Sequence, residues 1–301
     1  MPLPVDYHFC FKLGCRHRYL GESALAVLES ILSGLSSLDA LEWWLIGFVV
    51  AGLIVGIATG YFRARRIQPR GFKWKILGHE LIWTIINIST AVFTLGAMRQ
   101  LFLDQGLIFY STEPANFGVI ALEFALYFFL FDTWFYWGHR LMHIEPFYRW
   151  MHKTHHKSTS TNPLTSTSVT PFEAFLNGSF VSFFLAGAAL LSQVFSFISP
   201  IHTATLALIL PTSVLMGIYV HSGFEFLPRW WNRSWATKWF ISATFHDQHH
   251  RYFTGNFGGY TTIWDRICGT MRKNFEPDFE KITTQPLKGF SRKQKDPEAS
   301  T

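Results

Sequence analysis

The chain has 301 residues, of which 49% are hydrophobic, 18% aromatic and only 15% charged. Soluble domains carry about 25% charged residues and the mean hydropathy here is +0.16, so the composition excludes an ordinary soluble domain and indicates an integral membrane protein. The net charge of +6 comes with no basic stripe interleaved with aromatic residues, so no nucleic-acid partner is expected; Lys and Arg on the cytoplasmic side of a bilayer account for it instead.

The N-terminal segment, residues 1–40, is mixed in character. Residues 24–38 place apolar side chains at helical spacing, which predicts an amphipathic helix lying in the membrane interface. No cleavable signal peptide is visible. The three cysteines, Cys10, Cys15 and Cys268, are expected to be free thiols, although the first two can pair if the N-terminus faces an oxidising space.

The first predicted membrane span is residues 43–62, an uncharged run long enough to cross about 30 Å of hydrocarbon. The loop that follows, 63–75, holds four Arg and two Lys and no acid, and the positive-inside rule puts it in the cytoplasm. A second span over 81–101 leads to an acidic loop, 104–118, on the far side. A third span over 119–138 then returns the chain to the cytoplasm.

Two further apolar stretches, 174–198 and 203–220, are separated by a turn region around Pro200. They form either two full crossings or a re-entrant hairpin, and both arrangements return the chain to the side it left. The predicted fold class is therefore all-α: an integral membrane helical bundle of about four to five spans with a cytosolic, helical, histidine-rich cap. The expected organisation is an N-terminal segment, one unit of bundle and cap, and a basic, partly disordered tail, at residues 1–40, 41–275 and 276–301.

Three histidine clusters follow the spans. They are His139 and His143; His152, His155 and His156; and His246, His249 and His250. Because residues three and four apart share a helix face, each cluster is expected to present two or three imidazoles toward one point. Imidazole suits iron, copper, zinc and nickel, and eight imidazoles are too many for one ion and about right for two. A structural zinc site would use four ligands, often cysteines, so a redox pair of irons with open positions for dioxygen fits better.

The repeated H-x-x-H-H pattern, at His152 and His246, argues against an adventitious histidine-rich tract. Single histidines elsewhere have a simpler interpretation. We expect His8, His17 and His202 to be amphipathic or hydrogen-bonded residues. His79 is a further ligand candidate, but it has no partner at ligand spacing.

The histidine boxes resemble those of the fatty acid hydroxylase and sterol desaturase superfamily, which comprises integral membrane non-haem di-iron oxidases. The run DTWFYWGHR at 132–140 resembles the segment that leads into the family's first box. HSGFE at 221–225 resembles the segment before the third box of sterol methyl oxidases. NFGGY at 256–260 and WDR at 264–266 resemble the segment after that box. The resemblance covers about residues 119–275.

The resemblance implies a set of roles. Two iron ions and dioxygen would oxidise a lipid C–H bond, with electrons from NAD(P)H passing through a b-type cytochrome or a ferredoxin and its reductase. The eight box histidines would be catalytic and iron-binding residues, and His221 would be a ninth ligand. The fatty acid hydroxylase branch has a second histidine four residues later, where this chain has Glu225, which either binds iron or leaves one ligand fewer. Asp132 would orient an imidazole or pair with Arg140 or Arg149.

The expected function is that of a membrane oxidoreductase that desaturates or hydroxylates a sterol or sterol-like lipid, with a fatty acid or sphingolipid hydroxylase as the alternative. A metal transporter is disfavoured because transporter ligands lie within the spans. An inactive lipid-binding homologue is disfavoured by the complete set of box histidines. Asn256 and Asp265 are expected to be structural or to support the ligands.

The expected surroundings follow from the same features. The partners are the lipid bilayer, a lipid substrate and the redox proteins. The location is an integral membrane position with the active site on the cytosolic side, in the endoplasmic reticulum of a eukaryote or the inner membrane of a bacterium.

Overall fold

The computed structural model describes residues 60–68 and 74–286, and in this part of the chain the secondary structure is helical, with isolated bridges and no strand. The predicted fold class, an all-α membrane bundle with a histidine-rich cap, is confirmed. The predicted interfacial helix at 24–38, nearly all of the span at 43–62 and the first two cysteines lie outside the described residues.

Four helices are long and apolar enough to cross a membrane. They are α4 (Trp74–Asp104), α5 (Phe117–Met142), α6 (Pro171–Val194) and α7 (Thr203–Val220). At 1.5 Å per residue even α7, the shortest, rises about 27 Å, close to the thickness of the hydrocarbon core. The four spans predicted in this part of the chain are therefore confirmed as helices, and α4 begins at Trp74 rather than near Leu81.

Side-chain caps fix where two of these helices begin. Asn116 accepts a hydrogen bond from the N–H of Val119 at 3.0 Å and starts α5. Thr170 accepts one from the N–H of Glu173 at 3.3 Å and starts α6, with Pro171 at the first helical position. Both devices satisfy N–H groups that a helix start leaves without an intrahelical partner.

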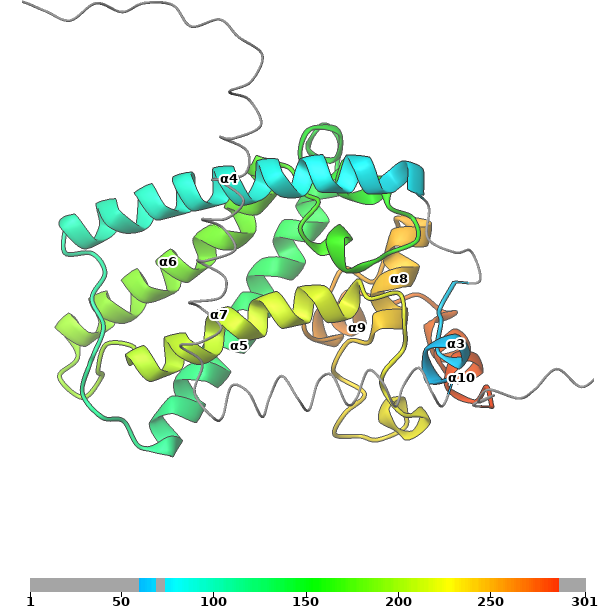
Figure 1. Ribbon diagram of the computed structural model, residues 1–301. Coiled ribbons are helices and arrows are strands. Elements are labelled where there is room, and N and C mark those ends of the chain that lie inside the picture. The colour runs from blue at the N-terminus through cyan, green and yellow to red at the C-terminus, as the bar shows by residue number, and fades with distance from the viewer. Residues whose placement is uncertain (1–59, 69–73, 287–301) are drawn as a thin grey trace, which may run out of the picture. The chain divides into compact units, whose positions relative to one another are not determined.

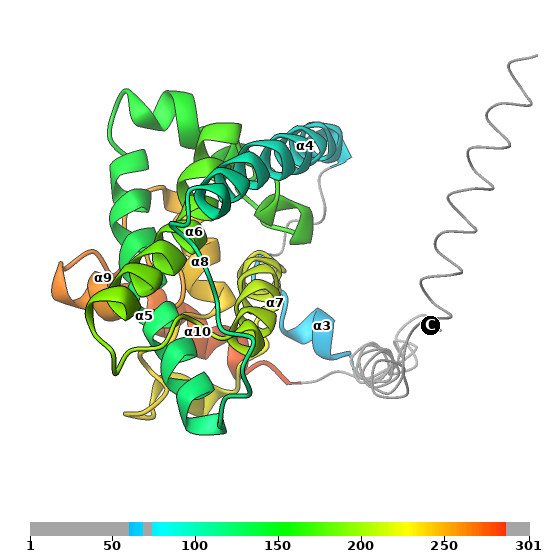
Figure 2. The same ribbon diagram turned by 90° about the vertical axis from the view of Figure 1, so that its left-hand side faces the viewer.

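Helix α4 packs along α6, and α5 contacts both α6 and α7 (Figures 1 and 2). The close approach of α4 and α6 requires glycine at position 178 of α6, because a Cβ there would overlap the side chain of Leu95 on α4. An aromatic core lies beside α5 and consists of Tyr127, Phe131, Phe180, Ile209 and Tyr260. Since Tyr260 comes from the segment after the last span, this core fastens the C-terminal part of the chain to the bundle.

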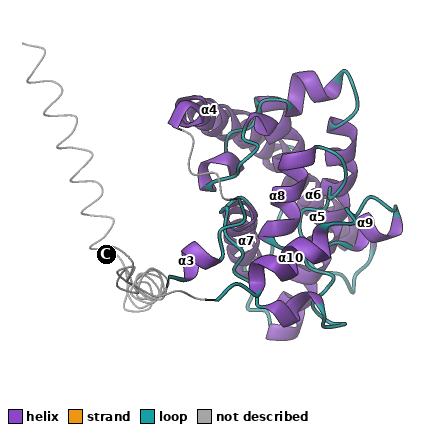
Figure 3. Cartoon of the chain, turned by 90° about the vertical axis from the view of Figure 1, so that its right-hand side faces the viewer, coloured by secondary structure: helices purple, strands orange, loops and turns teal. Residues whose placement is uncertain are grey.

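Shorter elements gather toward one end of the four long helices (Figures 1 and 3). They are α3 (Tyr61–Ala64), the π-helical turn η1 (Tyr148–His152), the 3₁₀ turns η2 (His155–Lys157), η3 (Pro163–Ser166) and η4 (Arg229–Asn232), and the helices α8 (Ala243–Tyr252), α9 (Ile263–Ile267) and α10 (Phe275–Thr283). The helical spacing predicted for the second histidine cluster is thus realised by two irregular turns rather than by one α-helix.

A second core joins α7, α8 and α10. It consists of Val220, Ile241, Phe245, Phe275 and Phe279. Helix α10 falls almost wholly in the segment predicted as a tail from residue 276, yet Phe279 and Ile282 are buried. The beginning of that segment is therefore folded, while the division at residues 1–40, 41–275 and 276–301 stays a prediction.

Candidate metal centre

Nine imidazoles, the same nine that the sequence and the resemblance single out, come together in two groups. The first group is His139, His143, His152, His156 and His249, and the second group is His155, His221, His246 and His250. Within each group the facing nitrogens all lie within 4.8 Å of one another, and every ring except that of His143 is buried. The segments around residues 150 and 250 therefore meet in one place, which agrees with the two long helices, α6 and α7, that separate them in the sequence.

Helix ends hold the ligand-bearing segments. His139 lies in the last turn of α5 and His143 at its C-cap, while His221 is the C-cap residue of α7. The remaining six histidines lie on η1, η2 and α8. Ser242 accepts a hydrogen bond from the N–H of Phe245 at 3.3 Å, so α8 starts directly before its three histidines.

Each H-x-x-H-H box is divided between the two groups, so two of its imidazoles face one point and the third faces the other. In the box at 152–156 the first and last histidines join the first group, and His155 joins the second. In the box at 246–250 the first and last histidines join the second group, and His249 joins the first. The reason is geometric: residues four apart lie about 40° apart around a helix, whereas adjacent residues lie about 100° apart.

The tips of the rings face one another in the first group. The Nε2 atom of His152 lies 3.0 Å from that of His139 and 3.0 Å from that of His156. The Nε2 atom of His249 lies 3.0 Å from that of His156 and 3.1 Å from that of His143. All five histidines thus direct the same ring nitrogen inward.

The second group repeats this arrangement around His221. The Nε2 atom of His221 lies 2.9 Å from that of His246, and 3.2 Å from those of both His155 and His250. The Nε2 atoms of His246 and His250 are 3.2 Å apart. Four rings therefore converge on a second point.

Backbone carbonyl groups fix the tautomer of four rings. A carbonyl oxygen only accepts hydrogen bonds, so an Nδ1 atom bonded to it carries the proton, and the Nε2 atom of that neutral ring carries a lone pair. These bonds run from His139 to Phe257 at 2.8 Å, from His249 to Gly255 at 2.9 Å, from His221 to Gly217 at 2.7 Å and from His250 to Ser158 at 3.1 Å. The facing Nε2 atoms of His221 and His250 are then two lone pairs 3.2 Å apart, which repel each other unless a cation lies between them.

Protonation of the imidazoles does not supply the positive charge between the facing Nε2 atoms. Burial lowers the pKa of His143 and of His221 to about 4. Burial first, and then the neighbouring imidazoles, hold the pKa well below its usual value for His152, His155, His156, His246, His249 and His250. The imidazoles are therefore neutral at neutral pH and keep their lone pairs available for metal ions.

The spacing of the donors fits metal coordination. Two nitrogens bound to one ion at about 2.1 Å and at right angles are about 3.0 Å apart. The closest separations here run from 2.9 Å for His246 and His221 to 3.2 Å for His250 and His221. Groups of five and four neutral imidazoles match the preferences of a borderline transition metal such as iron.

Glu173, in the first turn of α6, belongs to the centre but was not expected from the sequence. Its Oε1 atom lies 3.0 Å from Nδ1 of His152, and both side chains are buried. The carboxyl group thus lies beside the ring nitrogen opposite the inward-facing Nε2 atom of His152. A carboxylate at the start of an apolar span is the signal in the sequence that points to it.

Two candidate ligands lie outside both groups. Glu225 accepts the N–H of Leu227 at 3.0 Å and the N–H of Thr244 at 2.9 Å, so it joins the segment after α7 to the start of α8. Burial raises the pKa of the Glu225 carboxyl. The ring of His79 lies beside Trp83 on α4. Metal binding by either residue stays a hypothesis without geometric support.

Asp132 neither orients an imidazole nor pairs with an arginine, and both predictions for it are wrong. Its carboxylate accepts the N–H groups of Tyr260 and Thr261, each at 2.8 Å, and the Thr261 hydroxyl at 2.5 Å. These donors come from a distant loop and satisfy a carboxylate that α5 buries. Asp265 holds the same loop, since it accepts the N–H groups of residues 257 and 258 at 2.9 and 2.7 Å.

Asn256 and His202 have the supporting roles expected of them. Asn256 donates to the carbonyl of Phe245 at 2.9 Å and accepts the N–H of Arg272 at 2.8 Å, which links α8 to the segment before α10. His202 lies with its Nδ1 atom 2.7 Å from Oε1 of buried Glu123 and stands at the start of α7.

A cavity of about 320 Å³ borders both groups. The histidines in its wall are His139, His152, His155, His221 and His246. Side chains of α4, α5, α6 and α7 complete the wall, including the apolar Phe131, Phe135 and Met216 and the polar Asn87 and Asn177. A molecule entering between the long helices would therefore meet the metal centre at the inner end of this cavity.

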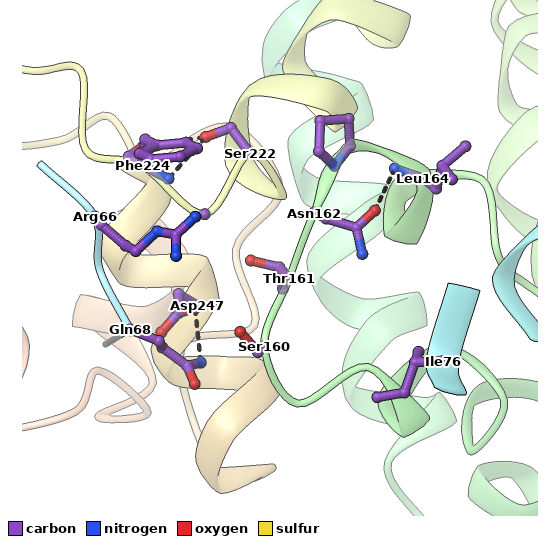
Figure 4. Close-up of a pocket in the computed structure, with 12 residues that line it drawn as sticks. Arg66, Gln68, Ile76, Ser160, Thr161, Asn162, Leu164, Ser222, Phe224 and Asp247 are labelled. Carbon is purple, nitrogen blue, oxygen red and sulfur yellow. Dashed lines mark hydrogen bonds between the residues drawn. The ribbon is translucent and has the colours of Figure 1, made fainter. Parts of the chain in front are cut away.

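A second pocket, of about 390 Å³, has none of the nine histidines among the described residues that line it (Figure 4). Several of its polar groups already bond within the protein. Gln68 donates to Asp247 at 2.9 Å, and Asn162 accepts the N–H of Leu164 at 3.0 Å. The chemistry is therefore assigned to the histidine-lined cavity.

The fold and the two groups define a helical membrane protein with a buried imidazole centre that can hold metal ions. Residues 124–270 match the fatty acid hydroxylase family. Methylsterol monooxygenase 1 of Gallus gallus is 31% identical over 220 residues, which cover 70% of this chain and 67% of that protein. The chain therefore belongs to the superfamily of the fatty acid hydroxylases and sterol desaturases.

Other relatives extend the similarity. The C-4 methylsterol oxidase erg25 of Schizosaccharomyces pombe is 26% identical over 254 residues, 80% of this chain and 78% of that protein. The Delta(7)-sterol 5(6)-desaturase ERG3B of Gibberella zeae is 26% identical over 217 residues, 71% of this chain and 61% of that protein. No solved structure matches the chain significantly.

Proposed function

We propose that this protein is a membrane oxidoreductase that uses two iron ions, dioxygen and two electrons to hydroxylate or desaturate a C–H bond of a sterol or sterol-like lipid. The observation that carries the proposal is the set of nine inward-facing imidazoles in two groups beside a cavity in a membrane bundle. The similarity to methylsterol monooxygenases and to a sterol desaturase supports the sterol class.

Bound iron supplies the activation of dioxygen and the oxidising power that an unactivated C–H bond requires. The nine histidines hold the ions. The carbonyl groups bonded to four rings keep the Nε2 atoms of those rings turned inward. Burial keeps water from those lone pairs, and the cavity holds one carbon of the lipid against the centre.

The proposal includes a centre on the cytosolic side of the membrane. The basic loop at 63–75 precedes α4, and the loop at 104–118 after it is acidic, which supports this orientation. A b-type cytochrome, or a ferredoxin with its reductase, then delivers electrons from NAD(P)H. The compartment is the endoplasmic reticulum in a eukaryote or the inner membrane in a bacterium.

A fatty acid or sphingolipid hydroxylase is the second candidate, and the match of residues 124–270 to the fatty acid hydroxylase family favours it. A metal transporter fits less well, because the histidines lie at the ends of α5 and α7 rather than midway along the spans. An inactive homologue fits less well, because all nine imidazoles still converge.

Metal analysis and lipid profiling test the proposal together. We expect about two iron ions per purified chain, and oxidised sterols that accumulate only in the presence of dioxygen when the chain is expressed. The variant His152→Ala should abolish the oxidised sterols and lower the iron content to about one ion per chain, while His79→Ala, which removes a histidine outside the groups, should change neither. Zinc as the only bound metal, or oxidised acyl chains with an unchanged sterol profile, would contradict the sterol oxidase.

A further inference from the structure

Residues 226–240 form most of the loop between α7 and α8 (Figure 1) and expose several large aromatic side chains. The exposed fraction is 57% for Trp230, 81% for Trp235 and 39% for Trp239. Exposed apolar clusters of this kind mark surfaces that bind a partner or a membrane. The loop therefore needs an occupant that covers these rings.

The backbone of this loop is held by the protein, so the exposed rings have fixed directions. Trp231 packs inward against the core that joins α7, α8 and α10. The hydroxyl of Thr237 donates to the carbonyl of Trp231 at 2.6 Å, and the N–H of Thr262 donates to the carbonyl of Trp239 at 2.6 Å. The indole N–H of Trp239 donates to the carbonyl of Trp235 at 2.8 Å. The exposed tryptophans thus belong to an ordered surface.

The end of the loop reaches along a membrane-spanning helix. The ring of Phe240 packs on that of Phe128 of α5, with centroids 6.2 Å apart. Phe128 lies about 16 Å along α5 from His139, at 1.5 Å per residue. Its neighbour Phe129 is 50% exposed, as a lipid-facing side chain would be. The loop therefore continues the lipid-facing surface of α5 and is not confined to the level of the histidines.

Basic side chains border the exposed rings, and they are Arg229, Arg233, Lys238 and Arg266. Two carboxylates, Glu276 and Glu280, pair with the three arginines, so an excess of positive charge remains. The ammonium of Lys238 lies 5.1 Å from the centroid of the Trp239 ring and has no carboxylate partner in the described part of the chain. Tryptophan beside Lys or Arg is typical of the membrane–water interface, where the ring enters the leaflet and the cation reaches the headgroups.

An anionic lipid leaflet fits this surface better than a protein does. A soluble partner would have to approach Phe240 beside the middle of α5, where hydrocarbon surrounds the protein. A second copy of the chain would present the same positive charge and be repelled. The indole N–H groups of Trp230 and Trp235 have no partner among the described residues, and the ester and phosphate oxygens of phospholipids accept such hydrogen bonds.

We propose that residues 226–240 form a membrane-docking loop, which inserts its exposed tryptophans into the leaflet on the side of the histidines and binds anionic phospholipid headgroups through Lys238 and the neighbouring arginines. The loop ends two residues before Ser242, the N-cap of α8. Its anchoring in the leaflet therefore fixes the depth at which α8 and its three histidines lie. This inference goes beyond the proposed function and does not depend on which lipid the centre oxidises.

Quenching of a fluorescent label at position 235 tests the insertion. In a chain whose Cys10, Cys15 and Cys268 are replaced by serine, Trp235→Cys is labelled with nitrobenzoxadiazole, and the full-length protein is placed in lipid nanodiscs. We expect phosphatidylcholine with a nitroxide on its acyl chain to quench this label, and aqueous iodide to leave it unquenched. The matched control is Lys273→Cys, an exposed position outside the loop, which should show the reverse pattern.

The variant keeps the fold testable, because Trp235 is 81% exposed and its side chain makes no hydrogen bond or ring contact with the described residues. Iodide quenching of the label at both positions would show that the loop faces water and would overturn the insertion. Protection of the label at position 235 from both quenchers would overturn it as well, since another segment of the chain or a second copy would then cover the ring.

The preference for anionic headgroups is tested with the same label at position 235. Nitroxide lipids with phosphoserine and with phosphocholine headgroups are compared at equal mole fraction. A basic residue near the membrane surface enriches an anionic lipid about fivefold, so the phosphoserine lipid should quench more strongly. This enrichment should fall about fivefold in Lys238→Gln and stay unchanged in Lys153→Gln, which neutralises an exposed lysine elsewhere in the cap.

Equal quenching by the two lipids in the chain that retains Lys238 would overturn the recognition of anionic headgroups. A preference for the phosphoserine lipid that is unchanged in Lys238→Gln would overturn the assignment to this residue. Both measurements need neither bound metal nor turnover, so their outcome is independent of the oxidase assignment.

Discussion

At the scale of single residues, the number of iron ions that a histidine variant retains can test the division into two groups, because neighbouring histidines belong to different groups. His246 and His250 belong to the second group, whereas His249 belongs to the first. We expect His246→Ala with His250→Ala to leave about one iron per chain after a chelator wash. His249→Ala with His250→Ala weakens both groups and should leave less. Equal residual iron in these two double variants would show that a box acts as one unit.

Glu225 tests whether a carboxylate completes the centre. Because it holds the N–H groups of Leu227 and Thr244, Glu225→Gln turns one acceptor into an amide that faces a buried donor. We expect a loss of stability of about 1–3 kcal/mol with unchanged iron content, measured by thermal unfolding and metal analysis. Loss of iron at unchanged stability would instead identify Glu225 as a ligand.

The histidines of the two groups were predictable because the spacing within each cluster is local in the sequence, whereas the residues around them were not. Asp132 bonds to Tyr260, 128 residues away, and no short pattern encodes such a pairing. Glu173 is separated from His152 by two irregular turns and a loop. Residues that only tertiary packing brings together share no short sequence pattern. For Glu173 the sequence offers one weak signal, a carboxylate at the start of an apolar span.

At the scale of elements, one buried carboxylate joins α4 to the segment that runs from the end of η2 into η3. Glu80 accepts hydrogen bonds from the hydroxyl of Ser158 at 2.6 Å, from Nδ2 of Asn162 at 2.8 Å and from the hydroxyl of Thr165 at 2.7 Å. The carbonyl of Ser158 in turn accepts the Nδ1 proton of His250. The position of α4 is thereby coupled to the second group.

We therefore expect Glu80→Ala to lower stability by about 3 kcal/mol or more, because three donors lose their partner, and to weaken iron binding in the second group. Thermal unfolding and residual iron after chelation measure the two effects. Glu113→Ala, an exposed carboxylate in the loop before α5, is the control and should change neither. A normal iron content in a destabilised Glu80→Ala protein would show that the position of α4 is not coupled to the second group.

Hydropathy predicted the four long helices of the described residues because apolar runs of this length have few alternatives in a bilayer. It did not predict η1 and η2, which replace a regular helix between Tyr148 and Lys157. The regular helix α8 divides His249 from His250 in the same way, so the division of His155 from His156 does not depend on these irregular turns.

At the scale of the whole molecule, stability should depend on pH in a defined window. An unfolded imidazole binds a proton near pH 6.5, whereas folded His143 and His221 do so only near pH 4. Between these values the unfolded chain holds more protons, so the unfolding free energy of the metal-free protein falls as pH drops, by about 1.4 kcal/mol per pH unit for each such imidazole. Melting temperatures recorded from pH 7 to pH 4 should fall, and His143→Gln should make the decline shallower. A flat profile would contradict the buried neutral state.

The proposed orientation can be tested by labelling. In a chain whose cysteines Cys10, Cys15 and Cys268 are replaced by serine, a single cysteine at Glu113 or at Lys273 is exposed to a membrane-impermeant maleimide. We expect Glu113→Cys to react from the side opposite the cytosol, and Lys273→Cys to react only after the membrane is permeabilised. The reverse pattern would place the histidine cap on the other side.

The division of the boxes has a consequence for the spacing of the two histidine groups. His155 and His156 have ring centroids 5.7 Å apart, and His249 and His250 have theirs 5.9 Å apart, and each pair contributes one ring to either group. In each pair, two consecutive residues connect the two groups directly, and the two pairs lie in different parts of the chain with nearly equal ring separations. The spacing of the two groups is thus tied to the covalent backbone at two places, and mutations elsewhere are expected to displace single rings more easily than they change that spacing.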